Sequence, residues 1–154
     1  MEAQQSDVAP LRVGARDQDL SARLAQELIA FNVRATGAGD QQGLSVRVTG
    51  AGGELIAGLA GWTWGDCSGI ASLWVHEQHR REGWGSRLVQ AAQDEARRRG
   101  CTQMNVSSLT FQAPDFYRRH GFIETGRTQG IPGGHADVHF WKRLEGVPVD
   151  SPRL

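Results

Sequence analysis

The stretch Arg80-Arg81-Glu82-Gly83-Trp84-Gly85 decides the fold, because it joins an apolar run at 70–75 to an amphipathic run that begins at Trp84. Glycine has no Cβ, so the phosphates of a ligand can approach the backbone closely at Gly83 and Gly85. The first turn of the helix that follows offers unpaired N–H groups and the positive end of the helix dipole. The stretch therefore predicts an anion-binding loop between a strand and a helix.

The loop differs from the common nucleotide-binding loops. A dinucleotide fingerprint needs a third glycine three residues after Gly85, and that position is Leu88. A Walker loop needs Gly-Lys-Ser or Gly-Lys-Thr, and the chain contains neither. These differences favour a phosphate-bearing cofactor of another class.

Composition narrows the class of protein further. A chain of 154 residues predicts one domain, and 17 basic residues balance 17 acidic ones. Without a broad basic field, nucleic acid and anionic membranes are disfavoured as partners. No apolar run approaches the roughly 20 residues of a membrane helix, and residues 1–10 lack the hydrophobic core of a signal peptide. Two cysteines suggest neither a disulfide framework nor a metal site, so we expect a reducing, cytoplasmic setting.

Apolar periodicity and turn residues predict the order of elements. We expect a flexible arm at 1–10, a single domain at 11–144 and a tail at 145–154. A short edge strand at 11–15 precedes a helix that begins after Asp17 or Asp19 and ends before Gly37. The remaining predicted elements are strands 44–49, 55–64 and 70–75, a helix at 84–99, a strand at 101–107, a short helix at 114–120, and strands 122–126 and 137–144 around a Gly/Pro-rich loop at 127–136.

This order predicts an α+β fold: a single mixed, mostly antiparallel twisted sheet with helices on both faces. The helix at 84–99 is the best specified element. Its predicted apolar stripe contains Leu88, Val89, Ala92 and Ala96. Spacing also predicts ion pairs between Glu95 and Arg99 and between Asp94 and Arg98.

Two motifs together resemble the GNAT superfamily of N-acetyltransferases. Arg80-x-x-Gly83-x-Gly85 resembles the acyl-CoA pyrophosphate loop of that family. Phe116-Tyr117-x-x-x-Gly121-Phe122 resembles its later motif, in which a short helix carries an aromatic pair ahead of a strand. The close match covers residues 70–126. It implies the GNAT acyl-CoA N-acyltransferase fold, with a cofactor in the wedge between two splayed central parallel strands, here 70–75 and 101–107.

The resemblance also implies a set of site residues. Tyr117 takes the place of the acid that protonates the leaving thiolate, with packing against the pantetheine arm as its other reading. The backbone N–H near Val75 takes the place of the donor to the thioester carbonyl. The residues implied to bind the cofactor are Trp74, Val75, Arg80, Arg81, Gly83, Trp84, Gly85, Ser86 and Tyr117.

The general base and the acceptor site are not assigned by the resemblance. Some family members use a glutamate at the position of residues 68–70, where this chain has no carboxylate, and the position of a family asparagine is Thr110. A water relay, Asp66, Glu77, His135 and His139 all stay open as the base. The candidates for binding the acceptor are Asn32, Trp62, Asp66, Glu77 and His135.

The resemblance implies an acetyl-CoA-dependent N-acetyltransferase that moves an acetyl group to a primary amine of a small molecule, by direct transfer in a ternary complex. A protein or peptide acceptor is the alternative with the same chemistry. A catalytically idle acyl-CoA-binding module is the alternative of another class, because the strand glutamate is missing. We expect no nucleic-acid, membrane or metal partner, while an exposed edge on the last strands would allow a homodimer.

Overall fold

The computed structural model describes residues 9–39 and 41–145. The chain forms two compact units, Met1–Gly37 and Ala38–Leu154, and each is described by itself. Most of the predicted arm at 1–10 and of the predicted tail at 145–154 lies outside the described residues. The assignment of 11–144 to a single domain stays a prediction.

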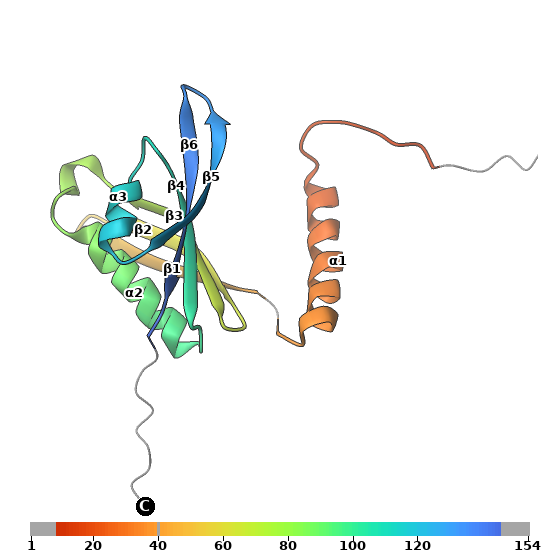
Figure 1. Ribbon diagram of the computed structural model, residues 1–154, viewed down its shortest axis with the longest axis horizontal. Coiled ribbons are helices and arrows are strands. Elements are labelled where there is room, and N and C mark those ends of the chain that lie inside the picture. The colour runs from red at the N-terminus through yellow and green to blue at the C-terminus, as the bar shows by residue number, and fades with distance from the viewer. Residues whose placement is uncertain (1–8, 40, 146–154) are drawn as a thin grey trace, which may run out of the picture. The chain divides into compact units, whose positions relative to one another are not determined.

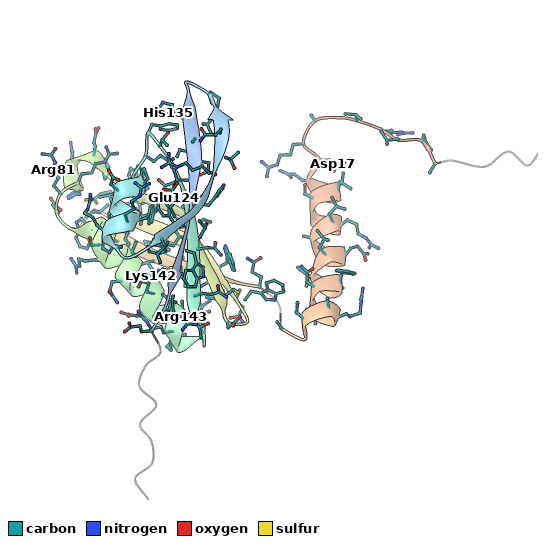
Figure 2. All side chains as sticks on the ribbon, in the orientation of Figure 1. Asp17, Arg81, Glu124, His135, Lys142 and Arg143 are labelled. Carbon is teal, nitrogen blue, oxygen red and sulfur yellow. The ribbon has the colours of Figure 1, made fainter. Side chains whose placement is uncertain are left out.

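Among residues 9–37 of the first unit there is one helix, α1 (Gln18–Thr36). Asp17 is its N-cap, and its carboxylate accepts a hydrogen bond from the backbone N–H of Leu20 at 2.9 Å (Figure 2). Gly37 ends the helix in the left-handed conformation, with φ 68°. The structure thus selects Asp17 over Asp19. The predicted strand at 11–15 is wrong, because no strand of the sheet pairs with these residues.

The second unit is a six-stranded sheet with two α-helices (Figure 1). Its strand order is β1-β2-β3-β4-β6-β5; β3 and β4 are parallel and all other neighbours are antiparallel. This arrangement confirms the predicted mixed, mostly antiparallel sheet. The elements are β1 (Gln42–Thr49), β2 (Leu55–Trp64), β3 (Cys67–Val75), the 3-10 turn η1 (Glu77–His79), α2 (Trp84–Arg98), β4 (Gln103–Leu109), α3 (Pro114–Arg119), β5 (Ile123–Ile131) and β6 (His135–Arg143).

The largest departure from the sequence-based prediction is the last hairpin. The predicted loop at 127–136 is mostly strand, because β5 continues to Ile131 and β6 begins at His135. Register shifts between Glu124 and Gly126 and between Gln129 and Ile131 leave Thr125 and Gly130 without a partner on β6. A bulge accommodates a glycine inside a strand, so Gly130 does not mark a loop.

One face of the sheet carries the hydrophobic core. The predicted stripe of α2 is buried, and it packs with apolar residues of β1 to β4 and β6. α3 adds Tyr117 to the same cluster, so α2 and α3 cover the same face of this sheet. Glu95 pairs with Arg99 as predicted, and hydrogen bonds from Arg98 and Arg99 lower the pKa of Glu95 to about 2. The predicted Asp94–Arg98 pair is wrong, because Arg98 turns to Glu95.

The two central parallel strands pair over only part of their length. Residues 67–70 of β3 pair with residues 103–106 of β4, and the pairing stops at Ile70 and Val106. A bulge in the β2–β3 pairing leaves Ala71 without a partner, so the inward-facing side chains change from Ser68 and Ile70 to Leu73 and Val75. Beyond the bulge β3 and β4 separate, as the predicted splay requires.

The close approach of β2 and β3 at this bulge predicts a strong effect for Gly61→Ala. A Cβ at Gly61 would collide with the carbonyl oxygen of Gly69, which is backbone and cannot move aside. We expect the free energy of unfolding to fall by about 1–3 kcal/mol, as in overpacked cores. Urea unfolding followed by tryptophan fluorescence measures this, because all five tryptophans lie in the second unit.

Gly58→Ala is the matched control on the same strand. Its Cβ would lie 3.6 Å from the Val46 carbonyl oxygen, an ordinary contact. Equal unfolding midpoints for the two variants would show that the β2–β3 approach tolerates a side chain.

Candidate functional site

A cavity of about 790 Å³ opens where β3 and β4 separate. Its walls come from the ends of both strands, the loop before α2, the first turn of α2, and α3. Every residue that the sequence predicts to bind the cofactor lines this cavity, as do both predicted catalytic residues. The sequence did not single out other lining residues, among them His79, Ser107, Phe111, Gln112 and Arg119.

The loop before α2 contains two residues with a left-handed backbone. Arg81 has φ 67° and Gly83 has φ 82°, and Arg81 is the sole non-glycine with positive φ among the described residues. Left-handed residues that alternate with right-handed ones turn successive N–H groups toward one point, an arrangement that binds anions, so residues 81–86 are a candidate anion cradle. Figure 2 shows Arg81 on this loop. The strained arginine is the kind of outlier that occurs at ligand sites.

Side-chain contacts hold this loop in place. The Arg80 guanidinium donates to the Val75 carbonyl oxygen at 3.2 Å and thereby ties the loop to the end of β3. The Glu82 carboxylate accepts from the Trp84 indole N–H at 3.0 Å and contacts His79 at 3.2 Å. Its hydrogen bond from Trp84, followed by that from His79, lowers the pKa of Glu82. These contacts of Arg80 and Glu82 therefore fix the position of the loop.

The first turn of α2 packs directly against α3. A Cβ at Gly85 would lie 3.2 Å from the Phe116 ring, so the second glycine of the motif allows the helices to approach each other. The Ser86 hydroxyl lies 2.9 Å from Nε2 of His120. Sequence reasoning explained Gly85 only by access of a phosphate and missed its role in this packing.

The separated end of β3 has backbone N–H groups without a partner strand on the side of the cavity. The N–H of His76 donates to the Ile56 carbonyl of β2 at 2.8 Å. Successive residues of a strand direct their amides to opposite sides, so the amides of Val75 and Leu73 face away from β2. Beyond Ile70 this side of β3 has no partner strand. Its N–H groups are available to a ligand in the cavity.

Tyr117 is the chain's single tyrosine, and it lies on α3 at the wall of the cavity. Its side chain is buried against Phe116, Phe122 and Phe140. Within the described residues its hydroxyl has no hydrogen-bond partner. Burial raises the pKa of Tyr117, so the phenol keeps its proton at neutral pH.

A second hollow, of about 510 Å³, lies at the same gap between the strands. It shares Ile70, Ala71, Val106 and Ser107 with the first cavity. Its other lining residues are Asn105, Thr125, His139, Phe140 and Trp141. Residues 105, 107, 139 and 141 alternate with the buried Val106 and Phe140, so this hollow opens on the sheet face opposite α2.

The structure does not bring the predicted acceptor residues of the second unit to either cavity. Asp66 lies in the β2–β3 turn, at the far end of β3, and Glu77 lies in η1. Trp62 covers Gly69, and His135 bonds to the Thr110 hydroxyl at 2.9 Å. Asn32 lies on α1 in the other unit, and its role stays a prediction.

At the two positions where family members carry a glutamate or an asparagine, this chain has side chains with structural hydrogen bonds. Ser68 is fully buried, and its hydroxyl donates to the Gln103 carbonyl at 2.7 Å. Thr110 is also engaged, because its hydroxyl accepts from the N–H of Ala136 at 3.1 Å. Ser68 and Thr110 hold neighbouring strands together, so the general base of the reaction must be another group.

Comparison with known proteins identifies the family of the chain. The family model of the Acetyltransferase (GNAT) domain matches residues 42–124, more than half of the chain. The chain belongs to the GNAT acetyltransferase family. The matched span contains β1 to β4, the anion-binding loop and α3, so it includes the first cavity.

Individual relatives of this chain are also named acetyltransferases. Acetyltransferase Atu2258 of Agrobacterium fabrum is 26% identical over 128 residues, which cover 83% of this chain and 93% of that protein. Blasticidin-S acetyltransferase of Streptomyces morookaense is 38% identical over 86 residues, which cover 53% of this chain and 61% of that protein. The crystal structure of an acetyltransferase from Bacillus cereus matches with a TM-score of 0.76 and 28% identity, over 87% of this chain and 98% of that one.

Among the described helices none is both long and apolar enough to cross a membrane.

The left-handed conformation of Gly83 predicts different affinities for coenzyme A in two variants. No atom lies within 4 Å of a Cβ placed there, so only the backbone conformation matters. Gly83→Val should weaken binding of coenzyme A about 5–30-fold, because the left-handed region costs L-residues about 1–2 kcal/mol. Gly83→Asn should bind nearly as well as the wild type, since asparagine tolerates this region. Calorimetric titration with coenzyme A distinguishes them, and equal weakening by both would reject the conformational explanation.

The buried phenol of Tyr117 predicts an alkaline titration. The folded protein should show tyrosinate absorbance with a midpoint above the value near 10 of an exposed tyrosine. The folded state binds this proton more tightly than the unfolded state, so its stabilising effect is lost as pH rises through the folded pKa. Tyr117→Phe should abolish the step. A midpoint at or below 10 in protein that circular dichroism shows to be folded would contradict the burial.

Proposed function

We propose that this chain is an acetyl-CoA-dependent N-acetyltransferase that transfers an acetyl group to a primary amine of a small molecule in a ternary complex. GNAT acetyltransferases use acetyl-CoA. The observation that carries the proposal is the first cavity, in which an N–H cradle, unpaired β3 amides and a protonated tyrosine face one space.

The cradle at residues 81–86 would hold the pyrophosphate of the cofactor. A single charge–dipole contact contributes only about 0.3–1 kcal/mol, or up to about 2 kcal/mol when partly buried, so several converging N–H groups are needed. The left-handed Arg81 and Gly83 supply that convergence. Arg80 and Arg81 add positive charge at the mouth of the cavity.

The unpaired edge of β3 would guide the pantetheine arm. An extended chain with amides can bond to an exposed strand edge as an added strand does. From the cradle the arm would run past Val75 toward Leu73 and the bulge at Ala71. The N–H groups of Val75 and Leu73 are then the donors to the arm and to the thioester carbonyl, whose developing negative charge they would stabilise.

Tyr117 would protonate the departing thiolate. It belongs to the cavity wall, its hydroxyl has no partner within the described residues, and burial keeps it protonated. A positioned general acid accelerates a reaction about 10²–10⁴-fold.

Two observations favour a small-molecule acceptor. The second hollow, at about 510 Å³, has the size of a small-ligand site. Blasticidin-S acetyltransferase, one of the relatives, is named for a small molecule. The alternative of an idle acyl-CoA-binding module rests on the missing carboxylate at 68–70.

A thiol-release assay tests the proposal. Acetyl-CoA is mixed with the protein and with a panel of primary amines that includes blasticidin S and a lysine-containing peptide. Release of coenzyme A with a small amine, together with the acetamide product by mass spectrometry, is the expected result. Binding of acetyl-CoA without release for any amine would favour the idle module, and release with the peptide alone would favour a protein acceptor.

Tyr117→Phe should lower turnover about 10²–10⁴-fold through loss of the acid. Affinity for acetyl-CoA should change little, because the ring and its packing stay in place. Turnover and calorimetric affinity are measured on the same preparation, and an unchanged turnover would exclude the acid role. Matching losses in affinity and turnover would instead indicate that Tyr117 only packs against the cofactor.

A further inference from the structure

The second hollow lies on the other side of the gap that the first cavity reaches. The two spaces share Ile70, Ala71, Val106 and Ser107, which are the last paired residues of β3 and β4 and the residues just beyond them. A thioester carried along β3 to the bulge at Ala71 would therefore be reachable from the opposite face of the sheet. This inference rests on the proposed function, because it assumes that acetyl-CoA binds in the first cavity.

His139 is the ionisable side chain that lines this hollow. It lies on β6 directly across from Ser107 of β4, one of the residues that both spaces share. The other lining residues offer hydrogen-bonding groups and apolar surface but no carboxylate. The hollow thus has nothing to hold an ammonium ion by charge, and it suits an amine in its neutral form.

The contacts of His139 leave one ring nitrogen available. Nε2 lies 3.0 Å from the Thr128 hydroxyl of β5. In the tautomer that donates from Nε2 to this hydroxyl, Nδ1 carries a free lone pair, and no described residue bonds to Nδ1. A ring nitrogen with a free lone pair can accept a proton from a group that approaches it.

We propose that the second hollow admits the acceptor amine and that Nδ1 of His139 takes up the proton the amine loses. The amine nitrogen attacks the thioester carbonyl carbon through the gap, and a C–N bond forms. His139 takes one proton from that nitrogen as the C–S bond breaks, and the thiolate takes the proton of Tyr117. Water returns the proton from His139 to Tyr117, so the products are the acetamide and coenzyme A.

The sequence had left His139 among several possible bases. Cross-strand placement now separates it from the others: Asp66, Glu77 and His135 line neither space. His135 lies on the same strand, yet its Nδ1 is engaged by the Thr110 hydroxyl at 2.9 Å. It is a matched control for the chemistry of His139.

Affinity labelling with bromoacetyl-CoA tests the proposal without a known acceptor. The probe carries an electrophilic CH₂Br group where acetyl-CoA has its methyl group. A nitrogen lone pair across the gap would displace bromide and form a C–N bond. We expect stoichiometric labelling that acetyl-CoA prevents, with the modified peptide containing His139 and the alkyl group on Nδ1, as located by mass spectrometry and NMR.

His139→Gln should lose this label, and His135→Gln should keep it. Labelling that acetyl-CoA prevents but that maps to another residue, or to Nε2 of His139, would overturn the proposal while leaving the proposed function intact. Tight binding of the probe with no label would overturn it equally. If neither bromoacetyl-CoA nor acetyl-CoA binds in calorimetry, the proposed function fails first, and the role of His139 falls with it.

Discussion

The site depends on the point at which β3 and β4 stop pairing. Two parallel strands that stayed in register would satisfy each other's amides and leave no gap. The extra residue Ala71 shifts the register of β3 against β2, and the pairing with β4 ends one residue earlier, at Ile70. This single bulge frees the amides beyond it and opens the sheet to both faces.

The parts around the gap hold one another in place. Arg80 fixes the loop to the end of β3, Glu82 fixes the loop to Trp84 at the start of α2, and Gly85 lets α2 approach Phe116 of α3. Each of these contacts involves a different element, so the position of the cradle relative to the gap follows from packing. The cradle, the free β3 edge and Tyr117 consequently line one space.

Local signals in the sequence predicted the half of the site that is local in the chain. The Gly83–Gly85 spacing and the Phe116-Tyr117 pair mark short segments, and the residues chosen from them line the first cavity. The proposed acceptor side could not be predicted in this way. His139 meets Ser107 only through the β4–β6 register. Asp66 and Glu77, which the sequence left open as base or acceptor-binding residues, line neither cavity. The β5–β6 hairpin is longer than predicted because Gly130, read as part of a loop, lies at a bulge within β5.

Arg81 shows a conflict between two demands on one position. A glycine would adopt φ 67° without the steric cost that an arginine bears, yet it would bring no positive charge to the mouth of the cavity. A laboratory evolution experiment that rewards heat resistance alone would therefore drift toward glycine here and pay in cofactor affinity. If this loop binds the cofactor as proposed, heat resistance and activity place opposite demands on residue 81, and an engineer must select for both at once.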